Sequence, residues 1–225
     1  AGIRLENVKI RDVAFGAPSD FTSVVGDNAM FAPSISAVWD TRDSVLRPAE
    51  GGKIEMSYEQ AFGAFTFPIL NLEASRYFTV WQRPDGSGKH IVSIRSQISY
   101  AGDDTPVYER FFAGGYTNLR GFEFRGVGPN VNGFMVGGQF QFLNRIEYQI
   151  PIRANDNLHF VTFLDSGTVE RDIGIKDYRV SAGFGLRVNI PMLGPVPLAF
   201  DFGFPIVRRD SDRTQIFSFG VGIFP

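Results

Sequence analysis

The sequence predicts an all-β protein, an antiparallel transmembrane β-barrel, and three observations support this fold class. Apolar and polar residues alternate with a period of two along the 225-residue chain, whereas helical periodicity is almost absent. Phenylalanine (23 residues) and glycine (25 residues) are in excess, which is typical of a sheet with an aromatic outer face. Short turns alternate with long loops, as they do at the two rims of an outer-membrane barrel.

About ten strands are expected. The segments with period-two alternation are 2–12, 33–42, 52–62, 69–82, 90–101, 134–150, 158–167, 178–190, 197–206 and 214–224. A short helix is expected within Ser19–Met30, inside a connection. Together the segments predict a single β-barrel domain over residues 1–225, without a linker or a second domain.

The sixth segment shows the two faces of the predicted sheet. One face carries Phe140, Phe142, Ile146, Tyr148 and Ile150, with Asn144 as an exception, and the other carries Gln139, Gln141, Arg145, Glu147 and Gln149. The alternative is a soluble β-sandwich, whose outer face would carry more Lys, Glu and Thr. A membrane barrel is favoured. The residues expected to face lipid are Phe140, Phe142, Phe160, Leu164, Phe217 and Phe219.

The order of the hairpins predicts which connections share a rim. The periplasmic connections are expected at 42–52, 83–89, 151–157 and 191–196. The outward-facing connections are expected at 13–32, 63–68, 102–133, 168–177 and 207–213.

Composition argues against several other functions. A net charge of -2 without a basic stripe argues against nucleic acid as a partner, and the chain has no cysteine for a disulfide or thiolate site. His90 and His159 fit no metal or catalytic motif. The loop carboxylates Asp103, Asp104, Asp210 and Asp212 are expected to be solvated rather than to bind a cation. We therefore expect no enzyme activity, no metal and no cofactor.

The segment Arg110–Pro129, with the sequence RFFAGGYTNLRGFEFRGVGP, is too aromatic for a solvated loop. Its aromatic side chains need a place to be buried, and Arg120 in its centre needs acceptors, because an unpaired buried charge is very costly. Two carboxylates follow on predicted strands. Glu147 lies on the polar face of the sixth segment, and Asp165 shares a face with Phe163 and Gly167 in the FLDSG motif. The alternative, that both carboxylates are ordinary lumenal charges in water, stays open at this point.

These motifs resemble those of BamA-type outer-membrane assembly factors. The run Leu119-Arg120-Gly121-Phe122 resembles the family's signature in its sixth extracellular loop, and FLDSG resembles its Phe-x-Asp-x-Gly strand motif. The segment Trp39–Gly52 is similar to a strand end and periplasmic turn of the family, and FSFGVGIF to its closing strand.

The resemblance implies a sixteen-stranded barrel in the outer membrane, preceded by periplasmic POTRA domains, that inserts and folds other β-barrel proteins. It implies that Arg120 pairs with Glu147 and Asp165. Its implied partners are unfolded outer-membrane proteins, outer-membrane lipid and accessory assembly subunits. With about ten strands and no POTRA domain, the chain is expected to be the C-terminal portion of a longer protein. Pro225 also stands where the family usually has a terminal aromatic residue.

The last segment is expected to form one side of a lateral seam. Its residues singled out for this role are Phe217, Phe219, Gly220, Val221 and Gly222. The small inner-face residues Ser218, Gly220 and Gly222 offer few side-chain contacts, so pairing across the seam would be weak. Two alternatives remain: a polypeptide transporter of the two-partner-secretion type, in which the same loop plugs a pore, and a passive porin or structural barrel.

Overall fold

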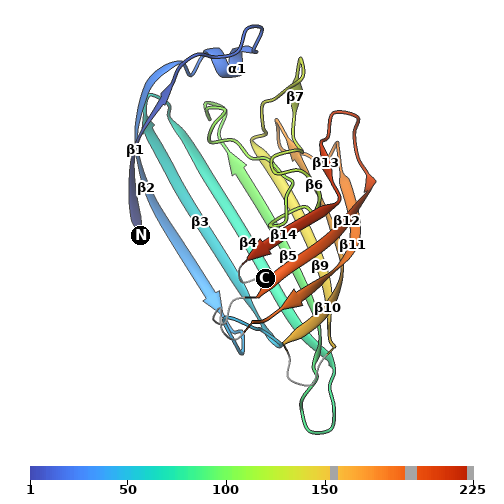
Figure 1. Ribbon diagram of the computed structural model, residues 1–225. Coiled ribbons are helices and arrows are strands. Elements are labelled where there is room, and N and C mark those ends of the chain that lie inside the picture. The colour runs from blue at the N-terminus through green and yellow to red at the C-terminus, as the bar shows by residue number, and fades with distance from the viewer. Residues whose placement is uncertain (153–156, 191–196, 222–225) are drawn as a thin grey trace.

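A single curved antiparallel sheet makes up most of the protein (Figure 1). The computed structural model describes residues 1–152, 157–190 and 197–221. The ten strands of the sheet follow each other in the order β1-β2-β3-β4-β5-β9-β10-β11-β12-β14. Neighbours in the chain are therefore neighbours in the sheet, apart from the short strands β6, β7, β8 and β13 of the loops. This meander confirms the expected fold of about ten antiparallel strands.

The strands β2, β3, β4, β5, β9 and β10 have 12 to 15 residues, and the others are shorter. Their bounds are β1 Gly2–Ile10, β2 Gly26–Asp40, β3 Gly51–Gly63, β4 Phe67–Trp81, β5 His90–Ala101, β9 Phe140–Pro151, β10 Leu158–Glu170, β11 Arg179–Val188, β12 Leu198–Val207 and β14 Phe217–Val221. The single helix of the described residues is α1, Ser19–Thr22. No helix in this part of the chain is long and apolar enough to cross a membrane.

Three differences from the sequence prediction have a clear structural cause. The second strand begins at Gly26 rather than at residue 33, because β2 pairs with β1 as far as Ile10↔Gly26, and the expected helix is limited to Ser19–Thr22. The sixth begins at Phe140 rather than at residue 134, because residues 130–135 form a hairpin of their own, β7 (Asn130–Val131) with β8 (Phe134–Met135). The last segment is split at Ile216 into β13 (Thr214–Gln215) and β14.

The faces of the sheet follow the predicted alternation. Leu164, Phe217 and Phe219 are exposed on the convex side, and Phe140, Phe142 and Phe160 are half-buried there. Phenylalanine rings of adjacent strands meet on this outer face, with ring centroids 5.7 Å apart for Phe184 and Phe202, 5.3 Å for Phe202 and Phe217, and 5.2 Å for Phe200 and Phe219. Such cross-strand pairs stabilise the last strands without a second sheet.

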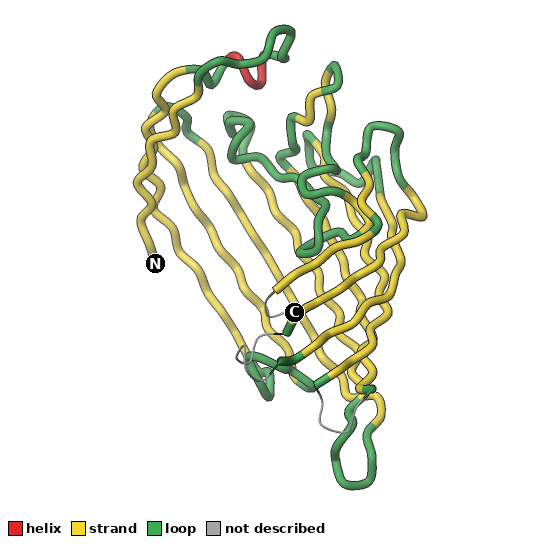
Figure 2. The backbone as a smooth tube through the Cα atoms, in the orientation of Figure 1, coloured by secondary structure: helices red, strands yellow, loops and turns green. Residues whose placement is uncertain are grey.

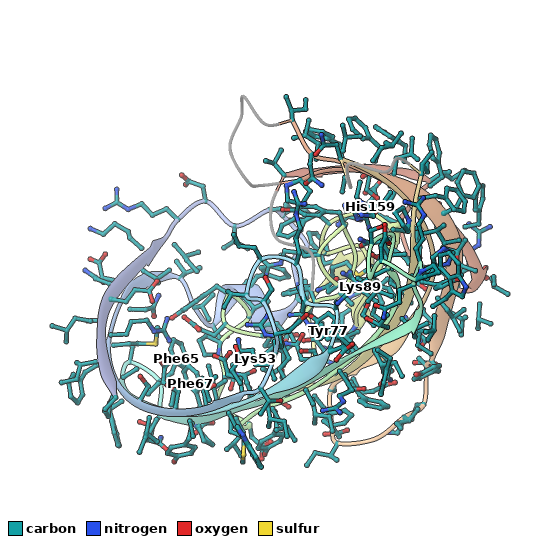
Figure 3. The ribbon with its side chains drawn as sticks, turned by 90° about the horizontal axis from the view of Figure 1, so that it is seen from below. Lys53, Phe65, Phe67, Tyr77, Lys89 and His159 are labelled. Carbon is teal, nitrogen blue, oxygen red and sulfur yellow. The ribbon has the colours of Figure 1, made fainter. Side chains whose placement is uncertain are left out.

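The long connections gather at one rim, and the 102–139 connection between β5 and β9 folds into the concave side (Figure 2). We call residues 102–139 the arginine loop. Viewed from the opposite rim, the sheet curves around an interior toward which the side chains of Tyr77 and His159 point (Figure 3). Both are buried. In the described residues β1 and β14 each have one neighbour, so the sheet is an open wall with two edges.

Candidate functional site: the arginine loop and its carboxylates

Arg120 is buried against the inner wall, with 1% of its surface exposed. Its guanidinium donates two hydrogen bonds to the Asp165 carboxylate, from Nε to Oδ2 at 2.7 Å and from Nη2 to Oδ1 at 2.8 Å. Its backbone N–H donates a third at 3.0 Å, and Nη1 reaches Glu147 Oε2 at 2.8 Å. This bidentate geometry is the strongest arrangement available to an arginine and a carboxylate. The expected pairing of Arg120 with Glu147 and Asp165 is present.

The register of the wall brings these partners together. Phe163 on β10 stands opposite Glu147 on β9, so Phe163, Asp165 and Glu147 all point inward. The Phe163 ring lies under the guanidinium, with Arg120 Cζ 3.4 Å from the ring centroid. Such a cation–π contact adds about 2 kcal/mol when it is desolvated. The FLDSG motif therefore supplies both the anion and the aromatic face that hold Arg120.

Glycines on the inner wall leave room for these groups. A Cβ on Gly183 would stand 2.4 Å from the Phe163 ring, and one on Gly185 would stand 1.9 Å from Asp201 Oδ1. Gly167 of the FLDSG motif makes room for Leu143, since a Cβ there would lie 2.6 Å from its side chain. The Gly183-Phe-Gly185 run is thus explained by close packing.

Three further charged residues complete the site. Asp201 on β12 accepts a bond from Arg120 at 3.3 Å, and Arg187 on β11 bridges Asp201 at 2.6 Å and Glu147 at 3.0 Å. Arg145 Nε lies 3.4 Å from Asp165 Oδ1. We call the six residues Arg120, Arg145, Glu147, Asp165, Arg187 and Asp201 the arginine cluster. Its three positive and three negative groups balance, as burial requires.

Asp201, Arg187 and Arg145 were not identified as site residues from the sequence. The sequence did hold a signal for them, because each lies on the inner face of a strand whose outer face is aromatic or aliphatic. Asp201, for example, stands between Phe200 and Phe202.

Burial alone would lower the pKa of Arg120, but Asp165, Glu147 and Asp201 raise it above the ordinary arginine value. Arg120 therefore stays charged.

The rest of the signature fixes the loop on the wall. Leu119 and Phe122 are buried in a cluster with Leu143 and Val169 of the wall, together with Ala113 and Val127 of the loop. The Ser181 hydroxyl donates a hydrogen bond of 2.5 Å to the carbonyl oxygen of Arg120. Gly121 has a φ of 92°, which glycine adopts without strain. In the Leu119-Arg120-Gly121-Phe122 signature, Leu119 and Phe122 are therefore packed in the core, Arg120 is ion-paired and Gly121 provides the backbone turn.

The loop also binds the segment that leads into the last strand. Strand β6 (Gly121–Phe122) pairs with β13 through Phe122↔Thr214 and Gly121↔Gln215. The Glu123 N–H donates to the Arg213 carbonyl at 3.0 Å, and the Arg213 N–H donates to the Gly126 carbonyl at 3.0 Å. The last strand is therefore continuous with a segment that pairs with the arginine loop instead of with β12.

In the last strand itself, Phe217, Phe219 and Val221 are exposed on the outer face, and Ser218 and Gly220 are buried on the inner one. This matches the expected orientation, while Gly222 lies outside the described residues.

Asp212 was expected to be a solvated carboxylate. Its side chain is instead buried in an ion pair with Arg179 at 2.9 Å. The prediction was wrong because the connection between β12 and β13 brings Asp212 against Arg179, the first residue of β11. In the described part of the chain, no group of three or more His, Asp or Glu residues could hold a metal ion.

The curved antiparallel wall, its apolar outer face and a lumenal loop held by a buried charge cluster define a class, the outer-membrane β-barrels with an inserted loop. Residues 1–224 match the model of the Omp85 superfamily domain, and the chain belongs to this superfamily. The protein is located in the outer membrane.

Named relatives agree with this assignment. The chain is 24% identical over 242 residues to the outer membrane protein assembly factor BamA of Nitratidesulfovibrio vulgaris, covering 99% of this chain and 29% of that protein. It is 25% identical over 223 residues to the sorting assembly machinery 50 kDa subunit of Saccharomyces cerevisiae, covering 89% and 44%. The crystal structure of BamA from Haemophilus ducreyi lacking POTRA domains 1–3 has the same fold, with a TM-score of 0.76 at 19% identity over 87% of this chain and 43% of that one. The chain spans less than half the length of each.

Proposed function

We propose that the protein inserts and folds β-barrel proteins in the outer membrane, and that it does so without covalent chemistry. Membership of the Omp85 superfamily and similarity to proteins named as an assembly factor and as a sorting assembly subunit support this proposal. Because the chain covers only part of these relatives, the activity of the whole protein belongs to the proposal. So do its partners, which would be unfolded outer-membrane proteins and accessory assembly subunits.

The physical requirement of such a function is a strand edge that can open. A closed barrel has no unpaired edge, and an open edge in lipid leaves backbone groups without hydrogen bonds. An assembly factor therefore needs one weak, controllable edge to which an incoming strand can pair. β14 is our candidate for one side of that edge.

The inner face of β14 is the observation on which the proposal depends most. Within the sheet, β14 pairs with β12, from Leu198↔Val221 to Phe202↔Phe217. Ser218 and Gly220 are buried on the inner face and add few side-chain contacts there. A seam lined by such small residues would be held less firmly than one with large interlocking side chains.

The arginine cluster supplies the contrasting rigidity. It ties the arginine loop to β9, β10, β11 and β12 through buried charge-assisted bonds. With those four strands held from inside, opening would be confined to the terminal strand. The proposed role of Arg120 is therefore to brace the wall next to the seam.

A disulfide lock tests the proposal. In the full-length protein, a cysteine at Ser218 would be paired with a cysteine on the first strand of the barrel, and growth of a depletion strain carrying this variant would be measured with and without reductant. A substrate strand can pair only with a free edge, so the bridge is expected to stop growth and reductant to restore it.

The control is a bridge inside the wall, with cysteines at Ser57 and Asn71, which are register partners on β3 and β4. This bridge leaves the seam free and is expected to permit growth. Normal growth with a fully formed Ser218 bridge would reject seam opening. It would favour a polypeptide transporter, whose substrate travels through the interior.

A further inference from the structure

Among the described strands, the outer face of the wall carries one charged side chain without a carboxylate partner. Four charged residues lie on this face of the described strands: Lys9, Asp27, Arg76 and Glu170. Lys9 and Asp27 form an ion pair of 2.9 Å at the loop rim. Glu170 is buried under its own hairpin, where it accepts bonds from the N–H groups of Lys176 and Asp177. For Arg76, no described carboxylate lies within 4 Å.

Arg76 points toward the membrane by the register of the sheet. Its nearest neighbours on the same face of β4 are Ala74 and Phe78, and Phe78 is 43% exposed. The stem of Arg76 lies across Gly52 of β3, since a Cβ on Gly52 would stand 3.1 Å from Arg76 Cδ. Its Cζ lies 5.5 Å from the Phe78 ring centroid. The guanidinium is therefore presented on the lipid-facing surface, where a charge needs a partner.

A groove begins beside this guanidinium. Its floor is made by the small residues Gly52, Ala74 and Ser96, and its sides by Trp39, Ile54 and Ile94. The groove has a volume of about 440 Å³. A second groove of about 480 Å³ starts one row further along the strands, over Met56, Leu72 and Ile98. At about 3.3 Å per residue, the six residue steps from Arg76 to Leu70 give the two grooves a combined length of about 20 Å.

The rim of the wall is close to Arg76. Trp39 is one residue from the end of β2 and 71% exposed, and Gly52, the register partner of Arg76, is the second residue of β3. Exposed tryptophan on the outer face of a barrel marks the level of the lipid headgroups. The guanidinium thus stands at headgroup depth, and the apolar groove runs from there toward the middle of the bilayer.

We propose that Arg76 and this groove form a binding site for an anionic phospholipid. The phosphate would accept hydrogen bonds from the Arg76 guanidinium, and one acyl chain would lie over Ala74 and Ser96 toward Leu72. Arginine suits a phosphate because its planar fork can donate two parallel bonds. A net anionic lipid is favoured over a zwitterionic one, whose own amine already neutralises its phosphate. Because this face contacts the bilayer, a lipid headgroup is the anion that the site would meet.

Native mass spectrometry of the full-length protein in detergent tests the site. Phosphatidylglycerol and phosphatidylethanolamine would be titrated separately, and lipid bound per chain would be counted. We expect Arg76→Gln to weaken binding of the tightest phosphatidylglycerol at least fivefold and to leave phosphatidylethanolamine unchanged. Ala74→Trp, which fills the groove and keeps the charge, should weaken phosphatidylglycerol as well.

Arg47→Gln is the matched control, because Arg47 is an exposed arginine on the β2–β3 turn of the same rim and outside the groove. It is expected to bind phosphatidylglycerol as the unaltered protein does. Retained heat-modifiable migration would verify that each variant is folded. Equal phosphatidylglycerol binding by Arg76→Gln, or equal loss in Arg47→Gln, would overturn the proposal. Displacement of the lipid by millimolar inorganic phosphate would also overturn it, since the site would then recognise the free anion.

Discussion

Gly203 of β12 lies directly against Gly121 of the arginine loop. A Cβ on Gly203 would stand 2.6 Å from the Gly121 nitrogen and 2.9 Å from the carbonyl carbon of Arg120. The Gly203 N–H donates to the carbonyl of Ile216 at 2.8 Å, just before β14 begins. Wall, loop and terminal strand therefore meet at this glycine, and its missing side chain allows the loop backbone to approach the sheet closely.

Gly203→Ala is expected to push the loop away from the wall and to destabilise the protein by about 1–3 kcal/mol, as overpacking of a tight contact does. The free energy of unfolding in detergent would be measured by urea titration. Gly174→Ala is the control, because a Cβ there would have its nearest neighbour, Lys176 Cε, at 3.9 Å. Equal stabilities of the two variants would contradict the close contact.

Arg120→Ala is expected to destabilise the protein by about 3–5 kcal/mol, because it leaves the buried Asp165 and Glu147 carboxylates without their main partner. Cleavage of residues 110–129 by added protease should become faster, and assembly of outer-membrane proteins should fall. Arg213→Ala should change stability by less than about 1 kcal/mol, since its ion pair with Glu123 is long (3.7 Å) and exposed. A resistant loop in the Arg120→Ala variant would refute the bracing role.

Phe163→Leu tests the aromatic support of Arg120 without changing a charge. Loss of the cation–π contact, together with the smaller side chain over Gly183, should lower stability by about 1–3 kcal/mol. In a double-mutant cycle, Phe163→Leu and Arg120→Lys should couple, because both residues form one contact. Additive losses would mean that Phe163 only fills space.

Acid is expected to loosen the contact between the outer loops. Asp20 of α1 forms an ion pair with Arg110 of the arginine loop at 2.5 Å. Burial raises the pKa of Asp20, but Arg110 outweighs it and the pKa lies below the ordinary value. A lowered folded-state pKa means that the contact stabilises the protein at neutral pH. This contribution is lost as the pH falls through that lowered pKa.

Hydrogen exchange of residues 102–113 between pH 7 and pH 3 measures this effect. Protection should fall on acidification beyond the intrinsic change in exchange rate. In Asp20→Asn protection should already be lower at pH 7 and vary less with pH. The same pH profile in both proteins would show that Asp20 does not control the loop.

Much of the fold could be read from the chain because the period of a strand is local. Each residue of β9 or β10 points to one face or the other by its parity, so the lipid-facing phenylalanines and the inward Glu147, Phe163 and Asp165 were predictable. The need of Arg120 for carboxylates was equally local, since it follows from the cost of burying a charge in an aromatic loop. The resemblance of the Leu119–Phe122 signature then indicated which carboxylates they were.

The tertiary structure alone decided which distant groups share the interior. Asp201 and Arg187 join Arg120 because the curvature of the wall brings β11 and β12 to the same concave side, a relation that no local pattern encodes. The split at Ile216 arises in the same way, since backbone groups of residues 213–215 find partners in the arginine loop rather than in β12. Periodicity is set by the geometry of a single strand, whereas pairing is decided by competition among segments that meet only once the sheet has curved.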